Sequence, residues 1–168
     1  MTLVYLDVET TGLDIRRHEV WEIAYAIDDG PILSSVVEHG FTTPDPFALR
    51  VNGYLDRAVG VQPDPLFERA LIEQLNGAVL VGANPAFDAR FLEARWGRAP
   101  WRYRLLDIEA YAMGALGFEY PYGLKDVREA LVALGHDIPA PDHTAAADVA
   151  TVRACHLALR SIYAGGRP

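Results

Sequence analysis

Two residue types that most proteins use freely are almost missing from this sequence. Cys155 is the single cysteine, so the chain can form no internal disulfide, and Lys125 is the single lysine. The N-terminus has no basic leader before Asp7, and no stretch approaches the roughly 18 uncharged apolar residues of a membrane span. These absences predict a protein of the reducing cytoplasm that does not span a membrane.

The charge of the chain is acidic, with a formal net value of −8. Tight binding of long duplex depends on many Lys and Arg contacts to phosphates, so this balance argues against it. The charge remains compatible with an enzyme whose metal ions contact the phosphate. Arginine supplies nearly all of the positive charge and suits bidentate phosphate contacts, although a GC-rich coding sequence explains the same bias.

The length and the hydrophobic patterning predict one α/β domain at residues 1–163, followed by a flexible tail at residues 164–168. The expected strands run from Leu3 to the turn at Gly12 and then over residues 20–27, 32–38, 78–81 and 103–106. The expected helices are residues 47–56, 64–76, 84–96, 108–116, 124–134 and 143–163. This order predicts a mixed sheet with helices on its faces.

Two carboxylates lie at the end of the first expected strand. Asp7 and Glu9 share one face, because side chains alternate between the two faces of a strand. Burying both without a partner is costly, and their mutual repulsion adds to that cost. A divalent cation between them removes both objections. At this pair alone, a frayed strand end with solvated acids is the favoured interpretation.

Two further acids occupy unexpected places on helices. Asp148 opens the core-facing stripe that continues with Val152 and Cys155, where an apolar residue is expected. Asp88 lies in the first turn of its helix, where the helix N-terminus alone explains a negative charge. Grouping these acids with the first pair around cations satisfies all four together. Carboxylate oxygens suit Mg²⁺ or Mn²⁺, and two such ions can clamp the oxygens of a phosphodiester during hydrolysis.

His143 precedes Asp148 by five residues, about 140° around a helix, so the two would not share a helical face. We therefore expect His143 in the loop or the first turn, reaching over the acids from one side. A histidine in that place can take a proton from water near neutral pH. A solvent-exposed loop histidine is the plainer alternative.

Three segments together resemble the motifs of the DEDDh branch of the DnaQ-like 3′–5′ exonucleases. They are residues 7–12 (Asp-Val-Glu-Thr-Thr-Gly), 84–92 (Asn-Pro-Ala-Phe-Asp-Ala-Arg-Phe-Leu) and 143–148 (His-Thr-Ala-Ala-Ala-Asp). The resemblance implies an RNase H-like fold, with a five-stranded mixed sheet, an antiparallel second strand and helices on both faces. It also implies hydrolysis at the 3′ end of single-stranded DNA or RNA, releasing nucleoside 5′-monophosphates.

The resemblance implies a role for each motif residue. Asp7, Glu9 and Asp148 would hold one metal ion, and Asp7 and Asp88 a second. His143 would be the general base. The residues expected to contact the 3′-terminal nucleotide are Thr10, Thr11, Leu13, Asn84 and Phe87.

One position departs from the family pattern, because Ala83 stands where many relatives have a histidine. Asp107 also resembles an acid of the family, and we interpret it as structural. Two alternatives stay open: a non-catalytic nucleic-acid-binding module on the same fold, and a phosphoesterase for small nucleotides. The expected partners are single-stranded 3′ ends, with a homodimer and a polymerase or replication partner as further expectations.

Overall fold

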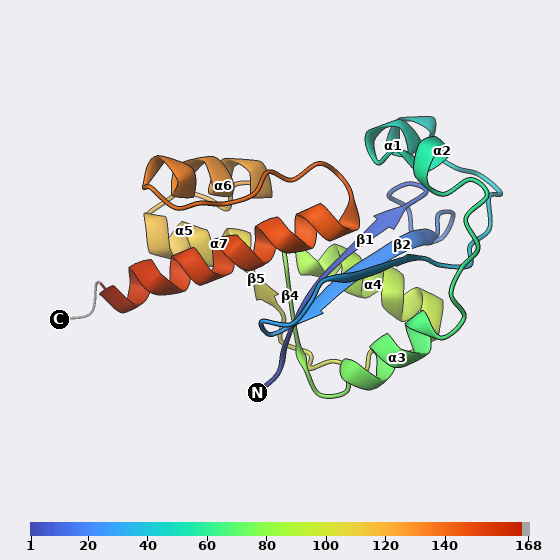
Figure 1. The fold of residues 1–168 in the computed structure, drawn as a ribbon, viewed down its shortest axis with the longest axis horizontal. Coiled ribbons are helices and arrows are strands. Elements are labelled where there is room, and N and C mark those ends of the chain that lie inside the picture. Colours follow the sequence, from blue (N-terminus) through green and yellow to red (C-terminus); the bar gives the residue numbers. More distant parts are fainter. Residues whose placement is uncertain (166–168) are drawn as a thin grey trace.

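A computed structural model describes residues 1–165 of the chain, and Figure 1 shows a single sheet between two groups of helices. Within these residues the strands are β1 (Leu3–Thr10), β2 (Val20–Ile27), β3 (Leu33–Val36), β4 (Val79–Gly82) and β5 (Leu106–Asp107). The helices are α1 (Pro46–Val51), α2 (Tyr54–Arg57), α3 (Phe67–Gln74), α4 (Pro85–Trp96), α5 (Ile108–Leu116), α6 (Leu124–Ala133) and α7 (Ala145–Gly165).

The five strands of residues 1–165 form one sheet in the order β3-β2-β1-β4-β5. Strand β2 is antiparallel to both β1 and β3, whereas β4 is parallel to β1 and β5. The predicted five-stranded mixed sheet with an antiparallel second strand is therefore confirmed. Its central strand, β1, is the strand that carries the first pair of acids.

Helices cover both faces of this sheet, as predicted. On one face, Leu6 of β1 belongs to a core cluster with Leu71 of α3 and Leu92 of α4. On the other face, Tyr5 of β1 clusters with side chains of α5, α6 and α7, among them Val152. Because β1 is buried on both faces, polar residues at its end have neighbours from both helical layers.

The edge strands are shorter than predicted. Strand β3 spans Leu33–Val36 instead of residues 32–38, and β5 spans Leu106–Asp107 instead of residues 103–106. Tyr103 is 81% exposed and lies outside the sheet. Strand β5 pairs with β4 alone, through two residue pairs, so little backbone pairing is available to extend it.

Three helix predictions need correction. The expected helix at residues 47–56 is two helices, α1 and α2, because Gly53 between them has a φ of 65°. Helix α3 begins at Phe67 rather than Asp64, whose side chain accepts a hydrogen bond from the Leu66 N–H in the preceding turn. Helix α7 begins at Ala145 rather than His143, which has a left-handed φ of 61°.

The far end of α7 continues to Gly165, so the first two residues of the predicted 164–168 tail are helical. The rest of that predicted tail, residues 166–168, lies outside the described residues. No helix within residues 1–165 combines the length and the apolar character that crossing a bilayer requires.

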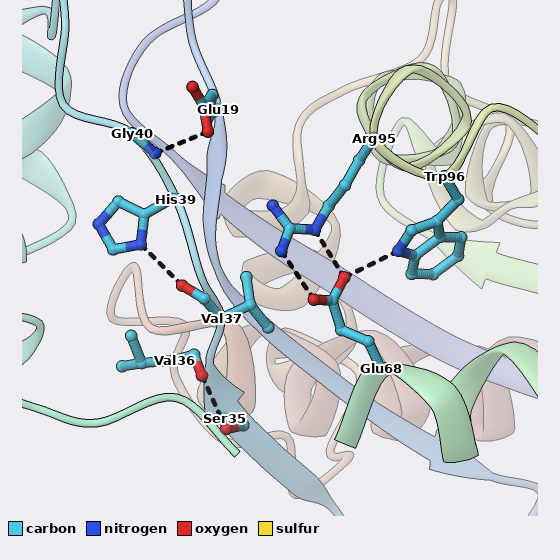
Figure 2. Close-up of polar contacts among 9 residues, drawn as sticks. All are labelled: Glu19, Ser35, Val36, Val37, His39, Gly40, Glu68, Arg95 and Trp96. Carbon is cyan, nitrogen blue, oxygen red and sulfur yellow. Dashed lines mark hydrogen bonds and ion pairs between the residues drawn. The ribbon is translucent and has the colours of Figure 1, made fainter. Parts of the chain in front are cut away.

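A polar contact fixes α3 against α4 on the first helical layer. Figure 2 shows Glu68 of α3 accepting hydrogen bonds from Arg95 and Trp96 at the end of α4, at 2.6 to 2.8 Å. Burial alone would raise the pKa of Glu68, but these bonds outweigh it and hold the pKa below its usual value. The contact anchors the C-terminal end of the helix whose N-terminal turn carries Asp88.

Candidate active site

The structure brings together three acids that are far apart in the sequence. Asp7 and Glu9 project from the same face of β1, and Asp148 lies in the first turn of α7, which packs over that face. One carboxylate oxygen from each residue lies within 4.8 Å of those of the other two. All three side chains are half-buried, so solvent alone does not neutralise their repulsion.

Asp88 joins this group from the first turn of α4. It is 4% exposed, and its Oδ1 accepts a hydrogen bond from the Val8 N–H at 3.0 Å. Val8 lies between the two acids of β1, so this bond holds Asp88 next to the end of the strand that carries them. The negative charge of Asp88 also helps to raise the pKa of Asp7.

The pKa values of all four carboxylates are raised above their ordinary values. Burial is the largest cause that raises the pKa of Asp7, Glu9, Asp88 and Asp148. For Glu9, the neighbouring charges of Asp148 and Glu22 add to burial and bring the pKa to about 8. The charges of Glu9, Asp88 and Asp148 destabilise the ionised form of Asp7, and a bound cation would reverse that effect.

The donor set fits a divalent cation. The Oδ1 atom of Asp148 is buried and has no hydrogen-bond partner among the described residues. Such an atom is costly unless something binds it. Every donor in the cluster is a carboxylate oxygen, which suits Mg²⁺ or Mn²⁺ better than zinc. An orphaned acceptor within an acidic cluster is therefore the feature that favours a metal ion here.

His143 lies in the loop just before α7. Its backbone is left-handed, and the neighbouring Asp142 side chain accepts a hydrogen bond from the Thr144 N–H at 3.0 Å. The Thr144 hydroxyl in turn accepts a hydrogen bond from the Ala147 N–H in the first turn of α7. The His143 ring is exposed and lines a cavity of about 380 Å³ together with Asp148. Its charge lowers the pKa of Asp148, against the larger effect of burial. The spacing argument thus placed this histidine in the correct segment.

An apolar pocket of about 210 Å³ lies beside Glu9, which is part of its lining. Of the predicted substrate residues, Thr10, Leu13 and Phe87 line it. Leu13 is 74% exposed, so its side chain is available to a ligand. The size and apolar character of the pocket suit a flat ring more than a charged group.

Two predicted substrate residues are absent from the described lining of this pocket. Thr11 is 3% exposed, and its hydroxyl accepts a hydrogen bond from the Glu19 N–H at 3.0 Å, so it fixes the loop after β1. Asn84 is exposed with a φ of 53°, and its N–H points to Asp107 Oδ1 at 3.4 Å. Their contact with a nucleotide stays a prediction.

The loop that presents Leu13 depends on Gly12. Its φ is 155°, and a Cβ there would lie 2.5 Å from the ring of His18. His18 Nδ1 in turn accepts a hydrogen bond from the Asp14 N–H at 2.9 Å. Glycine is therefore required for the histidine to close this loop, a role that the sequence analysis did not assign to His18.

Sequence reasoning missed other residues of the site. Phe47 and Val51 of α1, and Asn52 after it, also line the pocket beside Glu9. Their signal was weak, because α1 is too short for a hydrophobic period. Glu22 carried a clearer signal that was not used: it is the single acid in the otherwise apolar strand β2, and it is buried.

Comparison with known proteins supports the fold. No protein-family model matches this sequence, and no curated protein matches it. The solved structure of a moderately thermophilic exonuclease I from Methylocaldum szegediense does match, with a TM-score of 0.68 and 22% sequence identity. The match covers 95% of this chain and 40% of that one. At this identity the likeness shows the fold alone, and it agrees with the RNase H-like fold that the motifs predicted.

Proposed function

We propose that this chain is a metal-dependent 3′–5′ exonuclease that acts on single-stranded DNA or RNA. The observation that carries the proposal is Asp148, which has a buried Oδ1 without a hydrogen-bond partner among the described residues and a carboxylate oxygen within 4.8 Å of those of Asp7 and Glu9. The apolar pocket on the Glu9 side supplies a place for a terminal nucleoside, and the exposed His143 supplies a base on the Asp148 side. The structural match is named an exonuclease, which agrees with a nuclease activity. Its name does not indicate the substrate of this chain.

The proposal gives each carboxylate a metal to hold. Asp7, Glu9 and Asp148 would hold one Mg²⁺ or Mn²⁺ ion, and Asp7 with Asp88 a second. When bound, such ions acidify water and neutralise charge on a phosphate. The Val8 N–H bond to Asp88 fixes the position of that carboxylate.

The remaining residues bind the substrate and move a proton. Leu13, Phe47 and Phe87 pack against the base and sugar of the 3′-terminal nucleotide, which directs its 5′-phosphate toward Glu9. A ring nitrogen of His143 takes a proton from the attacking water. The oxygen of this water bonds to phosphorus, and the bond from phosphorus to the 3′-oxygen of the preceding nucleotide breaks. The products are a nucleoside 5′-monophosphate and a strand shortened by one residue.

The proposal extends to where and with what the protein acts. The net charge of −8 favours short or single-stranded 3′ ends over long duplex. The single cysteine agrees with a cytoplasmic location. A second copy of this chain, and a polymerase or replication protein, are the proposed protein partners. Light scattering of the purified protein would test the homodimer.

A gel assay tests the activity. The substrates are 5′-labelled single-stranded DNA and RNA of one sequence, each incubated with Mg²⁺, Mn²⁺ or EDTA. The matched control is Asp7→Asn, which keeps the volume of the side chain. Burial raises the pKa of Asp7 and so favours its neutral form, which the amide resembles. We expect a ladder that shortens from the 3′ end, requires the metal and is absent in the variant. The faster ladder identifies the preferred sugar.

Two other results would contradict the proposal, and each supports one alternative. A substrate that is bound but intact in every lane would indicate a non-catalytic binding module. Turnover of a single nucleotide phosphoester, with the oligonucleotide intact, would indicate a small-nucleotide phosphoesterase.

A further inference from the structure

Glu22 is a fifth acid beside the cluster, and it has partners of its own. It is 7% exposed and lies on β2 directly opposite Glu9 in the sheet register. One of its carboxylate oxygens is bonded to the guanidinium group of Arg57 from α2. The other, Oε2, accepts a hydrogen bond from the Ala145 N–H at 3.3 Å. Both oxygens of Glu22 are therefore engaged, in contrast to the orphaned Oδ1 of Asp148.

The bond to Ala145 reaches the first residue of α7, which is fully buried. The first N–H groups of a helix lack partners within the helix, and a negative charge there is stabilising. Asp148 follows three residues later, in the same turn, and His143 comes just before. Glu22 thus contacts the turn that carries Asp148 and follows His143.

Arg57 is held by more than its ion pair. Its Nη1 donates a hydrogen bond to the Asn52 carbonyl oxygen at 2.9 Å, and its guanidinium lies 5.1 Å from the centre of the Trp21 ring. Asn52 in turn donates from Nδ2 to the Thr10 carbonyl oxygen at 3.0 Å and lines the pocket beside Glu9. Contacts therefore run without a break from the pocket wall through Arg57 and Glu22 to the start of α7.

The charges around the site form two sets, each of which can be balanced separately. Asp7, Glu9, Asp88 and Asp148 carry four negative charges when ionised, which two divalent cations would balance. Glu22 adds a fifth, and Arg57 balances it. Without Arg57, Glu22 would be a buried carboxylate next to Glu9 that competes for the metal ions or repels its neighbours.

We propose that Glu22 and Arg57 act as a positioning pair, which holds the first turn of α7 at the distance from β1 that the metal ligands require and keeps Glu22 itself out of the metal site. This inference rests on the proposed function, because it assumes that Asp7, Glu9 and Asp148 bind metal ions. It assigns neither residue a contact with the substrate.

Substitutions that remove the charge of one partner test the pair. Glu22→Gln keeps the volume and an oxygen for the Ala145 N–H but sets an amide against Arg57. Arg57→Met keeps the apolar stem over Trp21 and leaves Glu22 unpaired. Arg57→Lys keeps the charge without the two-sided fork, so it should restore part of the loss. The control is the exposed pair Arg69 and Glu73 of α3, substituted as Arg69→Met and Glu73→Gln.

The readouts are Mn²⁺ affinity by calorimetry, thermal unfolding, and kcat and KM on an oligonucleotide. We expect Glu22→Gln and Arg57→Met each to weaken Mn²⁺ binding and kcat by about 10- to 100-fold, the usual loss when a group that orients a metal ligand is removed. KM should change much less, and the control pair should change none of these values. The double variant should lose less than the product of the two single losses, because the residues in contact act together.

A purely structural role predicts something different. If the role is purely structural, Glu22→Gln has a lower unfolding temperature, but the Mn²⁺ affinity and kcat of the folded variant are unchanged. That result would overturn the proposal that Glu22 and Arg57 position the metal ligands. Should Glu22→Gln not fold, unchanged Mn²⁺ affinity in Arg57→Met would overturn the proposal as well. Failure of this inference can be distinguished from failure of the proposed function. If the wild-type protein degrades no oligonucleotide, the difference in Mn²⁺ affinity between the wild type and the variants still tests the pair.

Discussion

Glu68 and the acids at the end of β1 differ in how their negative charge is compensated. Glu68 accepts three hydrogen bonds from Arg95 and Trp96, which lower its pKa despite burial (Figure 2). Asp7 and Glu9 face other carboxylates, so their pKa values rise. The charge of Glu68 is compensated within the protein, so we call the Glu68 site the complete group. The acids around Asp7 and Glu9 lack such compensation among the described residues, so we call them the incomplete group. Burial alone thus does not identify a functional acid; the partners do.

The largest effect should come from breaking the incomplete group. Asp7→Asn removes the ligand shared by both proposed metal ions, and each ion contributes several kcal/mol to stabilising the transition state. We expect kcat to fall at least about 100-fold. The unfolding temperature without metal should hold or rise, because one repulsive charge is gone. Unchanged turnover, measured by release of nucleoside monophosphate, would refute the assignment.

The next prediction distinguishes the role of His143 as a general base from that of a metal ligand. His143→Gln removes the proposed proton acceptor but no carboxylate, so kcat should fall about 100-fold, in the usual range for a general base. Mn²⁺ affinity measured by calorimetry should stay within a factor of two or three. His136→Gln, in the loop after α6, is the control and should leave both values unchanged. A large loss of Mn²⁺ affinity in His143→Gln would make this residue a ligand instead.

Phe47 gives a smaller and more specific effect. It is 71% exposed and lines the pocket beside Glu9, so Phe47→Ala should remove stacking on the terminal base without disturbing the core. Stacking on an aromatic side chain contributes about 1–3 kcal/mol per base, so KM should rise roughly 10-fold with little change in unfolding temperature. Leu55→Ala, an exposed apolar residue of α2 outside that pocket lining, is the control. Equal effects of both substitutions on KM would argue against a base in the pocket.

Phe47 also marks the limit of what the sequence predicted. The succession of strands along the chain and the placement of Asp7 and Glu9 on one face of the first strand followed from local rules, since alternation and turn residues act over a few positions. The mixed sheet with its antiparallel second strand was expected from the family resemblance. Asp148 was identified because an acid interrupted an apolar helical stripe. Phe47 lies on a six-residue helix that ends before Gly53, and so short a helix has no period to interpret.

Contacts between distant segments were beyond local rules. Glu22 and Arg57 are 35 residues apart, and the Ala145 N–H that Glu22 accepts from lies 123 residues away. An acid inside the apolar strand β2 signalled that a partner must exist. It could not indicate which arginine, because that depends on how α2 folds back over the sheet.

The dependence of stability on pH should distinguish the two groups further. The pKa of Glu9 is about 8 in the folded protein against 4.5 as its ordinary value. Between these values the folded state holds a proton that the unfolded chain has released, so the free energy of unfolding falls as pH rises. The unfolding temperature in EDTA should therefore drop from pH 5 to pH 8, by about 2–4 °C for each kcal/mol lost.

Metal ions should oppose that drop, because they compensate the ionised carboxylates. Calorimetric melts with saturating Mn²⁺ should show a flatter dependence, and Glu9→Gln in EDTA should flatten it as well. An unfolding temperature that rises from pH 5 to pH 8 in EDTA would mean that the cluster already has its charge compensated within the protein.

The smallest effect on activity is expected at the complete group. Glu68→Gln keeps one oxygen for the Trp96 N–H but loses the charged bonds to Arg95, so the free energy of unfolding should fall by about 1–3 kcal/mol. Glu73→Gln on the same helix, whose ion pair with Arg69 is exposed, should cost under about 0.5 kcal/mol. Because Arg95 is at the opposite end of α4 from Asp88, kcat and Mn²⁺ affinity should be those of the wild type. A fall in Mn²⁺ affinity for Glu68→Gln alone would show that α4 transmits strain to Asp88, and the two groups would then not be independent.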